Sequence, residues 1–467
     1  MRPLARRPGR HVAFLLVALT GLSPGGVRGE DGAPAQARDE TPRTSPPPDR
    51  PLPDYDGRPE PGPDAGDVLL WVPRILFAPL YAVSEYVIRR PLGWAISHAE
   101  EVELPEKVLG FFTFGKEQRG AWAPTFLLDF GLRPSVGLFF KLDDAGLEDH
   151  DFRFQFSTWG PNWLSAGIVN RYNPDDRPWD IQLATSATRR PDMLFYGIGA
   201  GIRDRFRSRY QHEKVTAELR FRADEIWLQS GLQVWAGVRY MDFGADVCCG
   251  DPSIQQRVEQ GDFPTPPGLE EGYLVYDQGI ELEVDTRRER PQPGTGGRLR
   301  LDGSHLFDLQ RPLDLRWVKY GGQLAGYLDV TGRNNVLSAT ATVELVESVA
   351  GEVPFTELVR LGGNGPMRGF IGGRLIGESG AAAVLEYRWP IWLWLDASVH
   401  VGVGNVFDGR FDDFALDRMR ASWGAGVRTS GSRDHSFDLL IAVGTQPFDE
   451  GGKIESVRFV FGGSRDF

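Results

Sequence analysis

The sequence predicts an all-β protein: a transmembrane antiparallel β-barrel preceded by a short N-terminal amphipathic helical segment. Three observations lead to this prediction. Apolar and polar residues alternate along most of the chain, as in strands whose two faces meet different environments. After the N-terminal segment no window holds the ~18 consecutive apolar residues of a membrane-spanning helix, and the mean hydropathy is -0.30. The first residues also have the pattern of an export signal.

Residues 1–29 have the three-part layout of a secretory signal peptide. Positive charge between Arg2 and Arg10 precedes an apolar run from Val12 to Leu22, and the exit Val27-Arg28-Gly29 places a small residue at the expected cleavage position. This run is too short to cross a hydrocarbon core of ~30 Å, which disfavours the alternative of a membrane anchor. We therefore expect cleavage after Gly29 and export of the remaining chain.

Two segments of different composition follow the signal. Residues 30–66 are rich in proline and charge and cannot bury a core, so we expect a disordered periplasmic linker. Residues 67–106 carry a partly helical spacing of apolar side chains interrupted by Pro73, Pro79 and Pro91. This spacing indicates an amphipathic segment at the membrane interface or in the barrel mouth. A helix packed on the barrel wall is an equally good interpretation.

The predicted barrel occupies residues 107–467. Alternation is clear over 152–156, 215–221 and 280–284, but soluble β-sandwiches share it. Tryptophan and tyrosine residues near predicted strand ends resemble the aromatic girdles of membrane barrels and favour that class. Strands of about ten residues give an even-numbered barrel in the mid-teens of strands, with 244–272 as an outer loop. Such a barrel, exported behind a signal peptide, is predicted to lie in the bacterial outer membrane.

Composition and motifs exclude several classes of function. A net charge of -12 argues against nucleic acid as a partner, because phosphate binding needs a concentrated basic surface. Cys248 and Cys249 are adjacent and cannot close a useful loop, so we interpret them as loop residues, with metal binding or redox switching as the alternative. The seven histidines lack the spacing of metal ligands, and no catalytic elbow or zinc motif occurs. The sequence predicts no cofactor, no metal and no enzymatic activity.

The glycine-rich stretch 361–370, LGGNGPMRGF, is the most informative motif. It follows 195–199, FYGIG, and 285–287, DTR, and precedes 385–388, LEYR, and 404–407, GNVF. In this order the motifs resemble the BamA/TamA-like surface-antigen superfamily of outer-membrane assembly and translocation barrels, from about Phe111 to the C-terminus. A plain glycine-rich hairpin is the alternative for this stretch. The resemblance implies 16 strands.

The resemblance also implies a site inside the barrel. In that superfamily the motif matched by Arg368, Gly369 and Phe370 lies at the tip of a loop folded into the lumen, and its arginine pairs with acids on the wall. Glu386 matches the first acid. An arginine fork on a carboxylate would pin the loop in one position. These four residues form a predicted lumen loop lock.

The sequence departs from the superfamily at two places. At the position where the superfamily has the second acid of the lock, this sequence has Gly402. Another acid, such as Asp396, is a candidate substitute. Typical members also carry periplasmic POTRA domains, for which residues 67–106 are shorter than the ~50 residues of a small domain and lack strand-helix alternation. Client capture by such domains is therefore not carried over.

The last strand ends in an aromatic pattern. Val457, Phe459 and Phe461 occupy alternate positions, and the chain finishes at Phe467. This pattern is similar to the C-terminal signal that assembly machinery reads in outer-membrane barrels. A chance terminal phenylalanine is the alternative.

The leading hypothesis is a barrel that assists insertion or transport of proteins or lipids at the outer membrane. Its first and last strands would pair imperfectly, leaving an edge for client strands. The expected partners are outer-membrane lipids, with unfolded outer-membrane proteins or a periplasmic protein as further candidates. The competing hypothesis is a passive pore or structural barrel without assembly activity. An enzyme with an outward-facing site has no sequence feature in its favour.

Overall fold

The computed structural model describes residues 110–115, 118–174, 177–226, 230–287, 294–392, 395–429 and 436–464, together with Tyr86 and Arg90. The chain divides into two units, 1–47 and 48–467, and every described residue belongs to the second. The predicted signal peptide, the linker and nearly all of the amphipathic segment lie outside the described residues and stay predictions. No helix in the described part has the length and apolar character that crossing a membrane requires.

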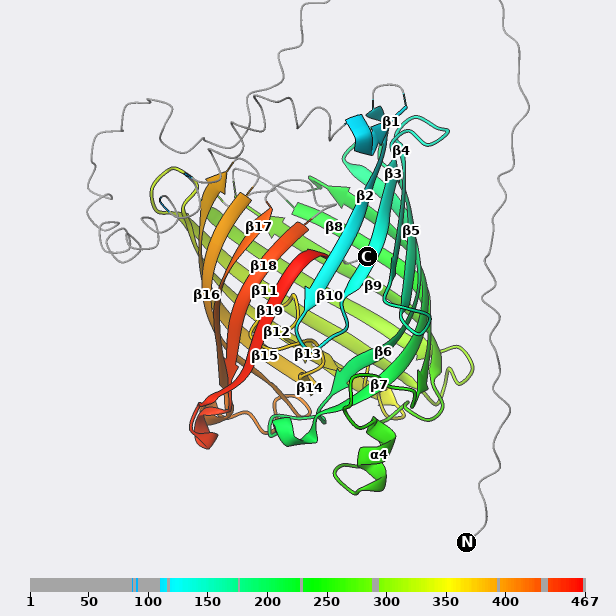
Figure 1. The fold of residues 1–467 in the computed structure, drawn as a ribbon, viewed down its shortest axis with the longest axis vertical. Helices are drawn as coiled ribbons and strands as arrows, with labels where there is room; N and C mark the ends of the chain where they lie inside the picture. The colour runs from blue at the N-terminus through cyan, green and yellow to red at the C-terminus, as the bar shows by residue number, and fades with distance from the viewer. Residues whose placement is uncertain are drawn as a thin grey trace, which may run out of the picture. The chain divides into compact units, whose positions relative to one another are not determined.

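In the described part of the chain sixteen antiparallel strands close into a barrel, which confirms the predicted fold class and strand number (Figure 1). They pair in chain order, β15 follows β12, and β19 returns to pair with β2. A short extra strand, β1, pairs with the first residues of β2. The strands are β1 (Thr113–Phe114), β2 (Gly120–Asp129), β3 (Ser135–Leu142), β4 (His150–Thr158), β5 (Leu164–Tyr172), β6 (Trp179–Phe195), β7 (Ser208–Asp224), β8 (Ser230–Gly244), β9 (Tyr273–Asp285), β10 (Gly296–Asp308), β11 (Arg316–Asp329), β12 (Val336–Ala350), β15 (Ser379–Trp392), β16 (Leu395–Phe407), β17 (Arg420–Thr429), β18 (Ser436–Thr445) and β19 (Ile454–Ser464).

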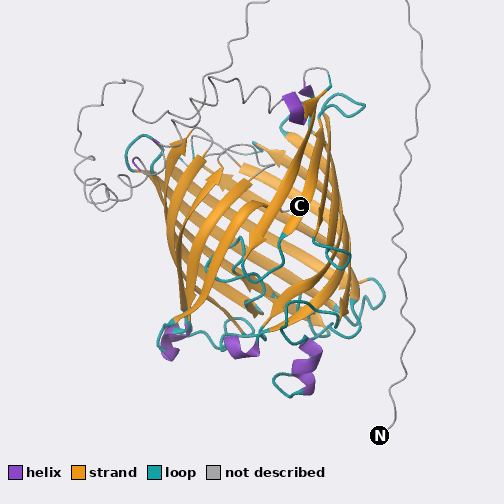
Figure 2. Ribbon diagram, viewed as in Figure 1, coloured by secondary structure: helices purple, strands orange, loops and turns teal. Residues whose placement is uncertain are grey.

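Most of the described helical turns and the long connections lie at one end of the barrel, called the loop end below (Figure 2), whereas the turn at 110–112 lies at the other end. The loop end carries η3 (Asp204–Phe206), α4 (Ile254–Glu259), η4 (Leu416–Arg418) and η5 (Phe448–Glu450). β8 ends at Gly244 and β9 begins at Tyr273, so a loop lies where the sequence predicts one. Cys248 and Cys249 lie in that loop and are bonded to each other. Their position in a loop agrees with the prediction, and a bridge between adjacent residues closes no useful loop.

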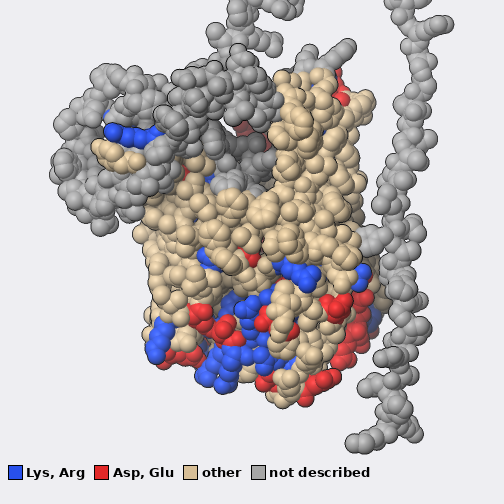
Figure 3. Space-filling view, in the orientation of Figure 1, with Lys and Arg blue, Asp and Glu red and all other residues tan. Residues whose placement is uncertain are grey.

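The two faces of the wall differ as the alternation predicts. On β7, Val215 and Leu219 are exposed, whereas Glu218 and Arg220 line a pocket on the inner face. Figure 3 shows a broad band without charge around the visible wall, with charged side chains gathered toward the loop end. Because charge on a lipid-facing wall is destabilising, this distribution suits a barrel that spans a membrane.

The largest apolar cluster joins wall strands to a loop. Phe195, Tyr210, Trp317 and Phe355 are buried together, and the ring of Phe355 lies 5.3 Å from that of Phe195 and 5.2 Å from that of Tyr210. Phe195 and Tyr210 belong to β6 and β7, whereas Phe355 lies in the connection between β12 and β15. This packing fixes that connection against the wall.

The pairing between β19 and β2, called the seam below, is short. Residues 460–462 face residues 127–129, and the described residues form no other strand pairs across it. On its other edge, β2 pairs with β3 from Gly120 to Leu127. The barrel is therefore closed by a much shorter ladder at the seam than beside it.

Candidate functional site: the lumen loop and the seam

The connection between β12 and β15, residues 351–378, is called the lumen loop below. It contains β13 (Val359–Leu361) and β14 (Leu375–Gly377), which form a two-stranded sheet of their own. Figure 2 shows it inside the ring of strands, and residues such as Phe355, Leu361 and Leu375 are buried. The loop is thus packed in the lumen, where the resemblance places it.

Arg368 extends from the lumen loop to the barrel wall. Its Nη1 donates to Oε2 of Glu386 on β15 at 2.9 Å. The two side chains are 23% and 19% exposed, so solvent in the lumen screens the pair in part. The structure therefore brings together the two charged residues that the resemblance singled out.

Gly369 is held by the last strands of the barrel. Its N–H donates to Oγ of Ser422 on β17 at 2.8 Å, and its carbonyl accepts from Oγ of Ser456 on β19 at 2.7 Å. A Cβ on Gly369 would overlap the carbonyl oxygen of Val443 on β18. Only glycine lets the backbone approach the wall this closely.

Phe370 and Met367 fill the space on the wall beside this contact. The ring of Phe370 is fully buried, and it occupies the space that a Cβ on Gly444 would need. The sulfur of Met367 lies 3.6 Å from the position of a Cβ on Gly402. Gly402 is where the superfamily's second acid was expected, and here an apolar loop residue packs over it instead.

The proposed substitute acid, Asp396, lies farther along β16 from the Arg368 contact. Asp396 is opposite Pro390 in the register, whereas His400 is opposite Glu386. His400 is buried, and neither of its ring nitrogens has a hydrogen-bond partner among the described residues. A histidine therefore stands beside the pair of Arg368 and Glu386.

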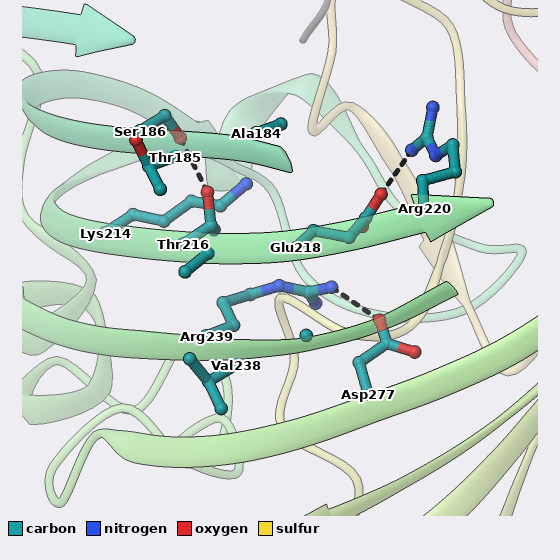
Figure 4. A pocket seen from close by; sticks show the side chains of 12 residues that line it. Ala184, Thr185, Ser186, Lys214, Thr216, Glu218, Arg220, Val238, Arg239 and Asp277 are labelled. Atoms are coloured by element: carbon teal, nitrogen blue, oxygen red, sulfur yellow. Dashed lines mark hydrogen bonds and ion pairs between the residues drawn. The ribbon is translucent and has the colours of Figure 1, made fainter. Parts of the chain in front are cut away.

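A second charged contact holds the lumen loop through Glu357, which is 2% exposed. Nη1 of Arg239 on β8 donates to both carboxylate oxygens at 2.7 Å, Nζ of Lys319 on β11 donates at 2.6 Å, and the hydroxyl of Tyr273 on β9 donates at 2.7 Å. Arg239 is also bonded to Asp277 at 2.9 Å, on the polar inner wall that Figure 4 shows.

The charge of Glu357 follows from these partners. Burial on its own would raise the pKa of this carboxyl group, but Lys319 and Arg239 outweigh burial and hold the pKa well below its usual range. Glu357 is therefore ionised at neutral pH. The loop contributes an anion here and a cation at Arg368.

A third contact joins the lumen loop to the last strand. Arg374 forms an ion pair with Glu455 on β19, and Nη1 of Arg420 on β17 donates to the same carboxylate at 2.6 Å. Nη2 of Arg420 also donates to the carbonyl oxygen of Ile202 at 2.7 Å. The exposed fractions of Arg374, Arg420 and Glu455 are 2%, 1% and 7%. The loop is thus tied to several strands of the wall by buried charge.

The family follows from the sequence. A family model described as the Omp85 superfamily domain matches residues 144–467. The chain belongs to the Omp85 superfamily. The barrel is similar to BamA from Haemophilus ducreyi lacking POTRA domains 1–3, with a TM-score of 0.52 and 15% identity over 74% of this chain and 70% of that one. CdiB from Acinetobacter baumannii aligns with a TM-score of 0.48 and 10% identity over 74% of this chain and 59% of that one. No curated protein matches the sequence.

Membership of the Omp85 superfamily confirms the predicted resemblance and places the barrel in the bacterial outer membrane. Two of the three aromatic residues of the predicted C-terminal signal are part of this barrel. Phe459 and Phe461 lie on β19, where their rings approach Phe130 at 5.4 Å and Phe126 at 6.1 Å across the seam. Phe467 lies outside the described residues, and the signal stays a prediction.

Sequence reasoning missed several charged residues of this Omp85 barrel's lumen. Glu357, Arg374 and Glu455 were not singled out, because each is an isolated charge among apolar or small neighbours. Because buried ions are rarely left unpaired, such a charge indicates that a partner exists if the residue is buried. It does not indicate which residue the partner is. The described residues contain no group of three or more His, Cys, Asp or Glu side chains able to hold a metal ion.

Proposed function

We propose that this Omp85 barrel assists the insertion or translocation of proteins at the outer membrane by opening its seam. The observation that carries the proposal is the short pairing of residues 460–462 with residues 127–129. The neighbouring ladder runs from Ser436 opposite Ser464 to Thr445 opposite Ile454. Because strands are held together by their ladder and cross-strand contacts, the seam is the weakest line of the wall.

The seam edge of β2 supports this proposal. Residues 122–126 have no strand partner on that edge among the described residues. The N–H of Phe130 donates across the seam to the carbonyl of Phe459 at 3.0 Å. Counting back from Phe130, the backbone groups of alternate residues of β2, including Pro124, point toward the seam. Proline has no N–H to donate. The open edge can accept a client strand over a short length, and Pro124 limits uncontrolled pairing.

The lumen loop is the second part of the proposed mechanism. Arg368, Gly369, Phe370 and Glu386 would act as a lock that keeps the loop seated against the wall. A seated loop blocks the lumen and braces the strands near the seam. Unfolded outer-membrane proteins are the proposed clients, and outer-membrane lipids surround the apolar wall.

Reconstitution in liposomes tests the function. The rate at which an unfolded outer-membrane protein inserts is compared with the rates in empty liposomes and in liposomes that hold a porin. We expect faster insertion with this barrel. A rate equal to that of the porin control would contradict the proposal and favour a passive pore or structural barrel.

A reversible crosslink tests the seam itself. Leu128 and Phe461 face each other in the register, so Leu128→Cys with Phe461→Cys places two thiols across the seam. Oxidation should abolish the faster insertion, and reduction should restore it. The matched control is Leu138→Cys with Phe156→Cys, which face each other between β3 and β4; its oxidation should leave the rate unchanged. Equal effects of both crosslinks would refute opening at the seam.

A further inference from the structure

The last strand binds the lumen loop through residues that follow one another closely along β19. Glu455 pairs with Arg374, and Oγ of Ser456 donates to the carbonyl of Gly369 at 2.7 Å. Nη1 of Arg458 donates to the carbonyl oxygen of Gly363. It also donates to the carbonyl oxygen of Arg368, at 3.4 Å. The lumen loop is therefore fastened to one of the two strands that form the seam.

Arg458 also bridges the seam. Its Nε donates to Oδ1 of Asp129 at 3.0 Å and its Nη2 to Oδ2 at 2.7 Å, and Asp129 is the last residue of β2. The side chains of Arg458 and Asp129 are 4% and 12% exposed. This is a bidentate contact, in which both groups are fixed in orientation. One guanidinium group is thus shared by β19, β2 and the lumen loop.

We propose that Arg458 is a positioning residue that makes closure of the seam depend on a seated lumen loop. The inference rests on the proposed opening of the seam. A guanidinium group has five N–H donors in one plane, and here Asp129 occupies one edge while the loop carbonyls occupy Nη1. When the loop tip withdraws, Nη1 loses its acceptors in a site nearly closed to solvent, and an unsatisfied buried donor is costly.

The consequence for the seam follows from its small size. The guanidinium group of Arg458 then turns toward water, which supplies new hydrogen-bond acceptors. This motion breaks the bidentate contact between Arg458 and Asp129, called the fork below. Because the backbone ladder at the seam spans only residues 460–462 and 127–129, the fork is a large part of what holds β2 to β19. Movement of the loop tip is in this way passed to the seam.

A double-mutant cycle on the full chain in lipid nanodiscs tests the coupling. Gly369→Ala unseats the loop tip, because the added methyl group overlaps the carbonyl of Val443. Hydrogen exchange is then measured in peptides that cover residues 120–130 and 454–464. Gly369→Ala should raise exchange at the seam roughly tenfold, the order expected for losing one charge-assisted hydrogen bond. In an Arg458→Lys background, which keeps the charge but not the fork, the same change should add less than about twofold.

The matched control is Arg171→Lys, which alters an arginine paired with Asp180 at 2.9 Å between β5 and β6, away from the seam. There Gly369→Ala should still raise exchange at the seam roughly tenfold. Asp129→Asn breaks the fork from the other side and replaces Arg458→Lys if that variant fails to fold. The coupling would be overturned if Gly369→Ala raised hydrogen exchange at the seam equally with and without the contact between Arg458 and Asp129. It would also be overturned if Gly369→Ala alone left hydrogen exchange at the seam unchanged.

Client insertion measured on the same variants separates the two proposals. If the cycle shows coupling but the wild-type barrel inserts clients no faster than a porin, the function fails and Arg458 still links the loop to the seam. If insertion is accelerated but the cycle is additive, only the coupling fails.

Discussion

Glu357→Gln removes the negative charge that Arg239 and Lys319 share while keeping the size of the side chain. Removing one partner of a buried ion pair costs about 3–5 kcal/mol, because the remaining charge is left uncompensated. Arg239 and Lys319 stay 23% and 29% exposed, and Arg239 keeps Asp277. We therefore expect the lower end of that range, about 3 kcal/mol of unfolding free energy.

The assay is denaturant unfolding of the barrel in lipid vesicles, followed by tryptophan fluorescence. Glu271→Gln is the matched control, since Glu271 pairs with Arg311 but the side chains are 69% and 43% exposed. The control should change stability by less than about 1 kcal/mol. If Glu357→Gln behaved like the control, the buried contact would not hold the loop, and the structural reasoning would be refuted.

Three further changes have defined outcomes. Arg368→Ala or Glu386→Ala should lower stability by about 1 kcal/mol, because the pair is partly screened; stability and single-channel conductance equal to wild type in both would contradict the lock. Gly462→Ala should speed client insertion, because the added methyl group would overlap the carbonyl of Phe126 at the seam; an unchanged rate would argue against seam opening. The pKa of Glu357 is lower in the folded state than the value near 4.5 expected in the unfolded state. The resulting stabilisation of the fold is fully present above pH 4.5 and is lost as the pH falls through the lower pKa of the folded state. Acid titration of wild type should thus show a larger loss of stability below about pH 4.5 than Glu357→Gln, and equal losses would contradict the assignment.

The fold could be predicted from the sequence because alternate residues of a strand lie on opposite faces of the sheet. Val215 and Leu219 face outward and Glu218 and Arg220 inward, as their spacing alone predicts. The strand number was not accessible in this way, because alternation does not show where one strand ends. It came from the order of the motifs around residues 361–370.

The site was only partly accessible. Arg368 and Glu386 were found through a motif, and the structure brings them together. Arg239 and Glu357 are 118 residues apart, and Asp129 and Arg458 are 329 residues apart. Such contacts depend on register and on closure of the barrel, which local sequence does not contain. An isolated charge shows that a partner is needed and does not show which one.

The relative burial of the three loop contacts ranks their importance. The side chains of Arg368 and Glu386 are 23% and 19% exposed, whereas the side chain of Glu357 is 3% exposed and that of Glu455 is 7% exposed. An exposed pair contributes about 0–1 kcal/mol, while breaking a buried one costs about 3–5 kcal/mol. The motif that identified the loop is therefore its weakest charged anchor. Within the lumen loop, Arg368→Ala should raise hydrogen exchange only near the tip, at 363–370, and Glu357→Gln should raise it over 351–361. Release of the whole lumen loop by Arg368→Ala would reverse this ranking, because it would mean that the buried contacts hold little without the tip.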